Sequence, residues 1–369
     1  MSPISGMREN ESCGMGMVTN WTCLGNVTCN IDSFKHSVYP ATYLVICTLG
    51  LGGNLFSLCV FLSVWRRKGT LTSVNLYLVN LLLSDLMLVC SLPFRIAYFL
   101  MGSNWAFGDF TCRLISYIFY INMYGSVYFL TVLSVMRYLA VTCPFRYVRL
   151  QSSRGAKVVC LLIWLFVSLV SIPLLTAGTN PRGKDRVQCL ELGDDDLDVL
   201  VYMNHATIFL SFVLPVLIIS FCYFFVVRSL LKPREVRGTK RPSYRRSCAL
   251  VIIVLAIFLV CYLPYHVVRT VFLQAEQEFR RRSGNAVSCD YIERVRKAAV
   301  VTLCLVTSNS CLDPVLFFFV GENFREFFHR GRKKIVRESK RRKENRQART
   351  ELQGLKPKES ECPEEIRRG

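Results

Sequence analysis

Seven long apolar segments are the feature of this chain that most constrains its fold. Each is long enough to cross about 30 Å of hydrocarbon, which takes roughly 20 residues of helix. They lie at residues 39–65, 73–101, 109–141, 156–177, 203–230, 246–274 and 291–319. Stretches such as 209–227 and 250–263 hold almost no polar residue, whereas a helix of a soluble core carries a polar face. The sequence therefore predicts an all-α membrane protein, a seven-transmembrane helix bundle.

Polar and ionisable residues lie inside two of these segments. Asp85 falls within the second, and Asn309 and Asp313 fall within the seventh. Charge inside a bilayer is costly and rarely kept without a use, so these residues are candidates for function. Outside the segments there is no Cys-His-Asp nucleophile set or metal-ligand spacing, which argues against an enzyme. The pattern favours a membrane signalling protein.

The placement of the basic residues explains the net charge of +20. They gather in the loops after the first, third and fifth segments and in the tail, with examples at Arg66, Arg149, Arg237 and Lys340. These positions share one side if the chain crosses seven times, as expected for a cytoplasmic face. The surplus therefore indicates topology, with anionic membrane lipids as partners rather than nucleic acid.

Three glycosylation triplets begin at Asn10, Asn20 and Asn26. Such triplets are modified only in the secretory lumen, so we expect an extracellular N-terminus on a multi-pass protein of the plasma membrane. Residues 1–35 lack a continuous apolar stretch, and no cleavable signal peptide is predicted there.

Six cysteines lie on the predicted extracellular side of the segments, and six thiols allow fifteen pairings. They are Cys13, Cys23, Cys29, Cys112, Cys189 and Cys289. A Cys112–Cys189 bridge would pin the loop before the fifth segment over the bundle. A Cys29–Cys289 bridge would staple the N-terminus to the last outer loop, which leaves Cys13 and Cys23.

The chain divides into four parts. Residues 1–38 form the glycosylated N-terminus and residues 39–319 the transmembrane bundle. Residues 320–331 carry Phe324, Phe327 and Phe328 at a spacing that suits a short amphipathic eighth helix on the inner membrane face. Residues 332–369 are polar and charged without periodicity, which predicts a disordered cytoplasmic tail.

An ordered set of motifs runs through the seven segments. The set comprises Gly52-Gly53-Asn54, Asn80 with Ser84-Asp85, Met136-Arg137-Tyr138, Trp164, Pro215, Cys261-Tyr-Leu-Pro-Tyr265 and Asn309-Ser-Cys-Leu-Asp-Pro-Val-Leu-Phe317. Across residues 39–331 it resembles the rhodopsin-like (class A) G-protein-coupled receptors. The stretches at 103–112, 122–128, 263–269 and 321–324 are most similar to the cysteinyl leukotriene receptors, in particular the type two subtype.

The resemblance implies a sodium site in the middle of the bundle, where Asn54 would join four ligand residues. The ligands would be Asp85, Ser126, Asn309 and Asp313. Two carboxylates that share one dry cavity need a neutralising cation or proton. The alternative is a hydrogen-bonded network that only packs helices, without a cofactor.

For G-protein coupling the resemblance points to Arg137 and Tyr138. Where the family usually has an acid before this arginine, the chain has Met136, which predicts either higher basal activity or a different resting partner for Arg137. The transmission residues would be Tyr262, Pro264, Pro314 and Phe317. Phe317 stands where the family usually has tyrosine.

A ligand pocket is indicated by charge and periodicity. Tyrosines recur at three- and four-residue spacing along the third segment, and cations lie in the outer halves of the second, sixth and seventh. Tyrosines suit a partly lipidic molecule, and arginines suit carboxylates or phosphates. By the resemblance, the residues that bind a peptide-conjugated eicosanoid are Arg95, Tyr120, Tyr124, Tyr265, Arg269 and Lys297. For Tyr117 and Tyr128 helix packing is favoured instead.

The partners implied by the resemblance are a lipid mediator, a heterotrimeric G protein of the Gq type with calcium release, and arrestin. A same-branch receptor for a nucleotide or small carboxylate would explain the cations equally well. A transporter predicts repeated halves, which the chain lacks. A non-signalling decoy is suggested by Met136, but Arg137 and the basic third loop argue against it.

Overall fold

The computed structural model describes residues 29–175, 178–182, 186–189, 197–231, 252–281, 289–320 and 337–345, together with Phe324 and Phe327. Within these residues, seven helices are long and apolar enough to cross a membrane, which confirms the predicted fold class. The first four are α1 (Asp32–Lys68), α2 (Ser73–Leu100), α3 (Gly108–Thr142) and α5 (Ser153–Ser171). The fifth span joins α6 (Leu197–Ile208), the π-helical turn η2 (Phe209–Val213) and α7 (Leu214–Leu231). The sixth covers Ile252–Arg281 and contains the π-helical turn η3 (Phe258–Tyr262) and α9 (Leu263–Arg281). The seventh joins α10 (Cys289–Thr307) and α11 (Asn309–Val320).

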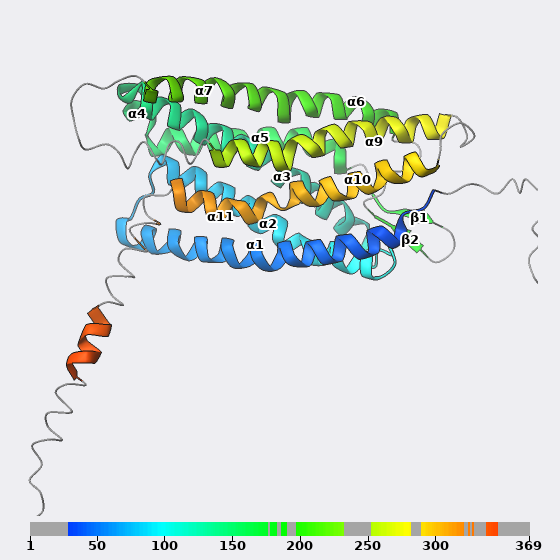
Figure 1. Ribbon diagram of the computed structural model, residues 1–369, viewed down its shortest axis with the longest axis horizontal. Coiled ribbons are helices and arrows are strands. Elements are labelled where there is room, and N and C mark those ends of the chain that lie inside the picture. Colours follow the sequence, from blue (N-terminus) through cyan, green and yellow to red (C-terminus); the bar gives the residue numbers. More distant parts are fainter. Residues whose placement is uncertain are drawn as a thin grey trace, which may run out of the picture.

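The spans lie side by side along one long axis (Figure 1). α1 begins at the end of the bundle that carries the short hairpin of β1 (Asn180–Arg182) and β2 (Arg186–Gln188), and α11 finishes at the opposite end. The strands are antiparallel, with Pro181 opposite Val187. The short helix α4 (Pro144–Leu150) follows α3 at the end away from the hairpin.

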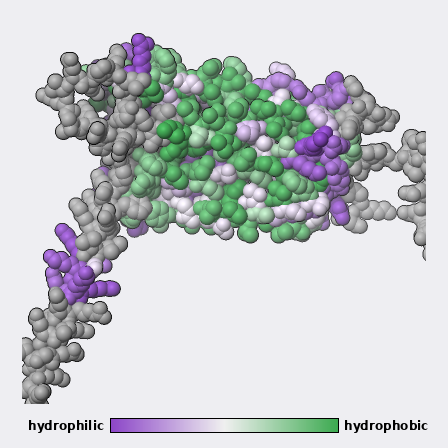
Figure 2. Space-filling model, in the orientation of Figure 1, coloured by the Kyte–Doolittle hydropathy of each residue, from purple (hydrophilic) through white to green (hydrophobic). Residues whose placement is uncertain are grey.

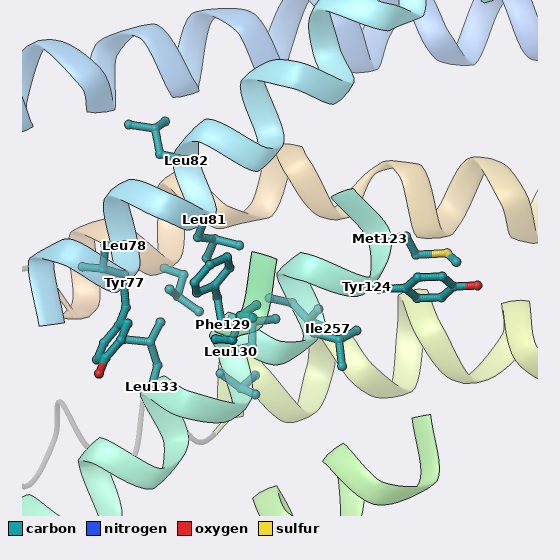
Figure 3. Close-up of a cluster of buried hydrophobic side chains, with 14 of the residues drawn as sticks. Tyr77, Leu78, Leu81, Leu82, Met123, Tyr124, Phe129, Leu130, Leu133 and Ile257 are labelled. Carbon is teal, nitrogen blue, oxygen red and sulfur yellow. The ribbon is translucent and has the colours of Figure 1, made fainter. Parts of the chain in front are cut away.

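The outer surface of the bundle is apolar where a membrane would cover it. Figure 2 shows a hydrophobic band across the middle and hydrophilic residues toward both ends. Large apolar side chains such as Leu49, Leu161 and Leu217 are more than half exposed. A second apolar set fills the interior between α2, α3 and the sixth span, as the leucines and Phe129 in Figure 3 show. Both faces of the spans are therefore apolar, and buried polar residues stand out against them.

Two spans extend beyond the apolar segments seen in the sequence. α1 begins at Asp32, whose backbone N–H donates to Asn30 Oδ1 at 2.6 Å. The sixth span continues to Arg281 through polar turns that include Glu276. Because these turns lie outside the apolar zone, hydropathy does not detect them, although their hydrogen bonding is helical.

Prolines shape the fifth and sixth spans in the same way. Pro215 and Pro264 each follow a π turn, in which Leu214 N–H bonds to Phe209 O and Leu263 N–H bonds to Phe258 O. A proline has no N–H to donate, so a carbonyl in the preceding turn loses its partner. In the fifth span the hydroxyl of Tyr128 donates to one of these carbonyls, Leu210 O, at 2.9 Å.

Small residues bring the first and seventh spans together. A Cβ on Gly53 would lie 2.9 Å from Pro314 Cγ, so only glycine permits this approach. Asn54 strengthens the contact by donating to the backbone oxygen of Ser310 at 3.0 Å. This close packing places Pro314 against α1.

Two disulfides tie the hairpin end of the bundle, which we call its outer end and the opposite end its inner end, and they confirm the predicted pairings. Cys112 on α3 joins Cys189 just after β2, and Cys29 joins Cys289 at the start of α10. The hairpin is held further by Trp105, whose backbone N–H donates to Val187 O at 2.8 Å.

Some predictions fall outside the described residues. These are the glycosylation triplets at Asn10, Asn20 and Asn26, the pair Cys13 and Cys23, and most of the expected eighth helix at 320–331. Within that helix, Phe324 is buried and its ring lies 5.1 Å from that of Phe61, while Phe327 lies 6.4 Å from Phe56. Residues 337–345 are helical with exposed side chains, inside the stretch whose composition predicts disorder.

Candidate functional site

A cluster of tyrosines around two arginines lies in the outer half of the bundle. Arg95 comes from α2, Tyr120 and Tyr124 from α3, and Tyr265 and Arg269 from α9. The Arg269 guanidinium interacts electrostatically with all three tyrosines, and Tyr265 also interacts with Arg95. Figure 3 shows Tyr124 apart from the inner leucines, with its hydroxyl directed away from them. Five of the six residues predicted to bind the ligand are therefore neighbours.

Arg95 is the most deeply buried cation of this cluster, at 5% exposure. Its guanidinium lies over the ring of Phe119, 4.3 Å from the centroid, and its Nε has no hydrogen-bond partner among the described residues. A buried guanidinium with an unused donor is expensive unless a partner of opposite charge arrives. The site is therefore suited to an anion.

Arg269 is the second cation of this cluster. Its guanidinium lies 5.7 Å from the ring of Phe272, and its other electrostatic neighbours are tyrosine hydroxyls. Within the part of the chain that the structure describes, neither Arg269 nor Arg95 meets a carboxylate. Two guanidinium groups among tyrosines can bind a carboxylate or phosphate through charge-assisted hydrogen bonds.

Lys297 lies apart from this cluster. Its Nζ is 3.2 Å from Glu293 Oε2, one turn back on α10, and its side chain is 43% exposed. Two other cations near the outer start of the seventh span are also paired with acids. Arg294 meets Asp290 at 2.8 Å, and Arg296 meets Glu276 at 2.6 Å. The argument from unneutralised charge therefore applies to Arg95 and Arg269 alone.

Two tyrosines of the third segment have the packing roles expected for them. The hydroxyl of Tyr117 donates to Ser168 O on α5 at 3.2 Å, and that of Tyr128 donates to Leu210 O.

Two further tyrosines near the arginines lie on α1 and were not selected from the sequence. Tyr43 is fully buried and interacts with Arg95, and Tyr39 interacts with both Arg95 and Arg269. Their four-residue spacing was the available signal.

A second polar cluster lies deeper, in the middle of the bundle. Asp85 and Asp313 are fully buried and interact with each other. Asn309 Nδ2 donates to Asp313 Oδ2 at 3.5 Å, and Asn122 Nδ2 donates to Asp85 Oδ1 at 3.3 Å. Asn122 was not among the residues predicted from the sequence, although its position one turn before Ser126 on α3 was a usable signal.

The donor set of this cluster fits a sodium ion. Five buried side-chain oxygens have no hydrogen-bond partner among the described residues. They are Asn54 Oδ1, Asp85 Oδ2, Ser126 Oγ, Asn309 Oδ1 and Asp313 Oδ1. Oxygen ligands of this kind suit hard cations. The described residues contain no group of three or more His, Cys, Asp or Glu placed for a metal, which argues against a transition-metal centre there.

Tyr262 connects this middle cluster to the break in the sixth span. It is buried at the end of η3, two residues before Pro264, and interacts with Asp85, Asp313 and Ser126. Its hydroxyl is 3.5 Å from the backbone oxygen of Met123. A shift of the sixth span about Pro264 would therefore change the contacts of the two carboxylates.

The inner end of the bundle carries the predicted coupling residues. Arg137 is half-buried near the end of α3 and interacts with Tyr223 of α7, which is hydrogen-bonded to Ser134 at 2.8 Å. Tyr138 packs its ring 6.0 Å from that of Phe221. Met136 is buried, and as a methionine it places no carboxylate next to Arg137.

Two further features lie at the inner end of the bundle. The helix α4, directly after α3, exposes Phe145 at 89% and Val148 at 70%, which sequence reasoning did not select. Phe317 is fully buried, with its ring 5.9 Å from that of Phe61.

Comparison with known proteins agrees with this architecture. Residues 53–317 match the family described as 7 transmembrane receptor (rhodopsin family). The chain is 43% identical over 302 residues to the cysteinyl leukotriene receptor 2 of Sus scrofa, covering 82% of this chain and 83% of that protein. It is 34% identical over 307 residues to the human cysteinyl leukotriene receptor 1, with 82% and 88% covered. It is 33% identical over 322 residues to the human uracil nucleotide/cysteinyl leukotriene receptor, with 86% and 83% covered.

The chain therefore belongs to the rhodopsin family of seven-transmembrane receptors. Within that family it is related to the cysteinyl leukotriene receptors. It is a multi-pass protein of the plasma membrane and a signalling receptor rather than an enzyme.

Proposed function

We propose that this receptor binds cysteinyl leukotrienes and signals through a heterotrimeric G protein of the Gq type, with calcium release. The observation that carries the ligand class is the pair of guanidiniums, Arg95 and Arg269, among tyrosines and without a carboxylate in the described residues. The ligand's carboxylates would pair with these cations, and its acyl chain would lie against the apolar bodies of the tyrosines. Lys297 would contribute to the same site from its outer rim.

The two carboxylates in the middle of the bundle would hold a sodium ion. Asp85 and Asp313 would supply the charge, and Ser126 and Asn309 would supply neutral oxygens, as their unpartnered atoms indicate. A bound cation would neutralise a pair of like charges that a dry interior otherwise disfavours. The contacts of Tyr262 would link this site to the ligand site and to the break at Pro264.

The G protein would dock at the inner end of the bundle. Arg137 and Tyr138 lie there, and α4 presents the exposed apolar side chains of Phe145 and Val148 beside the exposed cations Arg146 and Arg149. An exposed apolar pair rimmed by charge is typical of a protein-binding surface. Arrestin would use the same end, and this orientation would leave the N-terminus outside the cell.

A calcium-release assay tests the proposal. Cells that express the receptor, and matched cells that do not, are challenged with a cysteinyl leukotriene and separately with uracil nucleotides. We expect a saturable calcium response to the leukotriene that requires the receptor and is lost when Gq is inhibited. A response to nucleotides alone would reject the leukotriene assignment, and a response that survives Gq inhibition would reject the Gq assignment.

A nucleotide is the second candidate ligand. The same guanidinium pair suits phosphates as well as carboxylates, and the name of one relative at 33% identity joins uracil nucleotides with cysteinyl leukotrienes. The higher identity to proteins named for leukotrienes alone favours the first candidate.

A further inference from the structure

The outer start of α10 carries three cations, which pair with acids in two different ways. Arg294 and Lys297 pair with Asp290 and Glu293, four residues back on the same helix. Such pairs on an exposed helix surface contribute little. Arg296 is different because it reaches across to the sixth span.

Arg296 holds Glu276 of α9 through two parallel bonds. Its Nε donates to Oε1 at 2.6 Å and its Nη2 donates to Oε2 at 2.9 Å. The Glu276 side chain is 8% exposed and that of Arg296 is 23% exposed. A buried pair is costly to break from one side, because the remaining charge is then left without compensation.

The same guanidinium also anchors the N-terminal segment. Its Nη1 donates to the backbone oxygen of Cys29, the residue bridged to Cys289 at the start of α10. The ring of Phe279 lies 5.7 Å away, and Ala275 and Ile292 pack against Cys29. Arg296 therefore joins the N-terminal segment and the sixth and seventh spans at the outer end of the bundle.

Glu276 lies on the face of α9 that also carries Arg269. Seven residues of helix are two turns, which places Glu276 about 10 Å outward from Arg269 along the helix axis. An uncompensated carboxylate about 10 Å from a ligand's anionic group, at an effective dielectric constant of about 20, would weaken binding about tenfold. The pairing with Arg296 removes that repulsion.

We infer that Arg296 is a positioning and screening residue for the ligand site. It neutralises Glu276, a buried acid that the sixth span places outward of Arg269, so that a carboxylate-bearing ligand can occupy the pocket. This inference rests on the proposed anionic ligand and assigns no contact between Arg296 and the ligand.

The test is a set of four variants in the full-length receptor. They are Arg296→Gln, Glu276→Gln, the double variant, and Arg294→Gln as a matched control that removes an exposed cation from the same helix. Calcium responses to a cysteinyl leukotriene and to its carboxylate methyl esters are measured at matched surface expression. The esters carry less negative charge, so an unpaired Glu276 should repel them less than the acid. A purely structural effect of Arg296 would instead lower the potency of both ligands.

We expect Arg296→Gln to lower potency for the acid about tenfold while changing potency for the esters less than threefold. Glu276→Gln and the double variant should stay within threefold of wild type, because neither leaves a lone carboxylate. Arg294→Gln should stay within twofold.

Two outcomes would overturn the inference while the proposed function stands. One is an unchanged Arg296→Gln variant. The other is an equal loss of potency in Arg296→Gln and Glu276→Gln that the double variant does not restore, or a loss in Arg296→Gln that is as large for the esters as for the acid. Either result would indicate a purely structural role for Arg296. A wild-type receptor that ignores the leukotriene would reject the proposed function, and this inference with it.

Discussion

The outer and middle polar clusters of the bundle carry uncompensated charges of opposite sign. The outer cluster holds Arg95 and Arg269 without an acid in the described residues, and the middle cluster holds Asp85 and Asp313 without a base. Arg95 and Asp85 lie on the same helix, ten residues apart, which is about 15 Å along its axis. They are too far apart to neutralise each other.

This contrast indicates which kind of solute each cluster accommodates. Burial without compensation is tolerated only where a partner of opposite charge is available. The outer cluster is open to an anionic ligand among tyrosines, and the middle cluster to a small cation among oxygens. Tyr262 interacts with the middle carboxylates and lies near the break at Pro264, so we expect a movement of the sixth span to reach the middle cluster through it.

The largest effect is expected from Arg269→Ala. Removing one partner of a buried charge pair costs about 2–5 kcal/mol, so agonist potency should fall about 30-fold or more. Dose–response curves at matched surface expression measure this loss. Arg281→Ala removes an exposed cation from the end of the same helix and serves as the control. An unaltered curve for Arg269→Ala would remove this residue from the ligand site.

A smaller effect is expected in the middle cluster from Asp85→Asn. If the cluster holds sodium, exchanging choline chloride for sodium chloride in the buffer should raise the free energy of unfolding of the purified receptor by about 1–2 kcal/mol, because sodium binds the folded state. Asp85→Asn should abolish that difference in melting temperature. Asp109→Asn, which changes a half-exposed acid on α3, should retain it. Equal sodium stabilisation in Asp85→Asn and wild type would leave only a hydrogen-bonded network.

The smallest effect is expected from Lys297→Gln. Lys297 is partly exposed and already paired with Glu293, so its loss should lower potency threefold or less. Agonist dose–response curves of Lys297→Gln and Arg269→Ala, recorded in parallel at matched surface expression, provide the measurement. A loss as large as that of Arg269→Ala would show that the ion pair opens for the ligand and that the site extends to the seventh span.

Features with a local signal could be predicted from the sequence. Hydropathy located the seven spans, and the spacing of Tyr120 and Tyr124 placed them on one face of α3 with the cations nearby. The polar helical turns before Tyr39 and around Glu276 were missed, because they continue helices outside the apolar zone.

Contacts between distant parts of the chain could not be predicted. The pairing of Arg296 with Glu276 depends on how two spans meet, and no periodicity within either span encodes it. Asn122 was overlooked for a related reason. Its position one turn before Ser126 made it a candidate, but only the packing of α2 against α3 shows that its amide reaches Asp85. The disulfide pairings were available as candidates, because cysteines outside the spans are few.

Equilibrium binding tests the central claim that Arg95 and Arg269 form a site for an anionic lipid mediator. Membranes with wild-type receptor, Arg95→Ala or Arg269→Ala are incubated with a radiolabelled cysteinyl leukotriene at matched receptor density. We predict saturable binding to wild type, displaced by unlabelled leukotriene, and a strong loss of affinity in both variants. Saturable binding with unchanged affinity in both variants, or no saturable binding to wild type, would contradict the account.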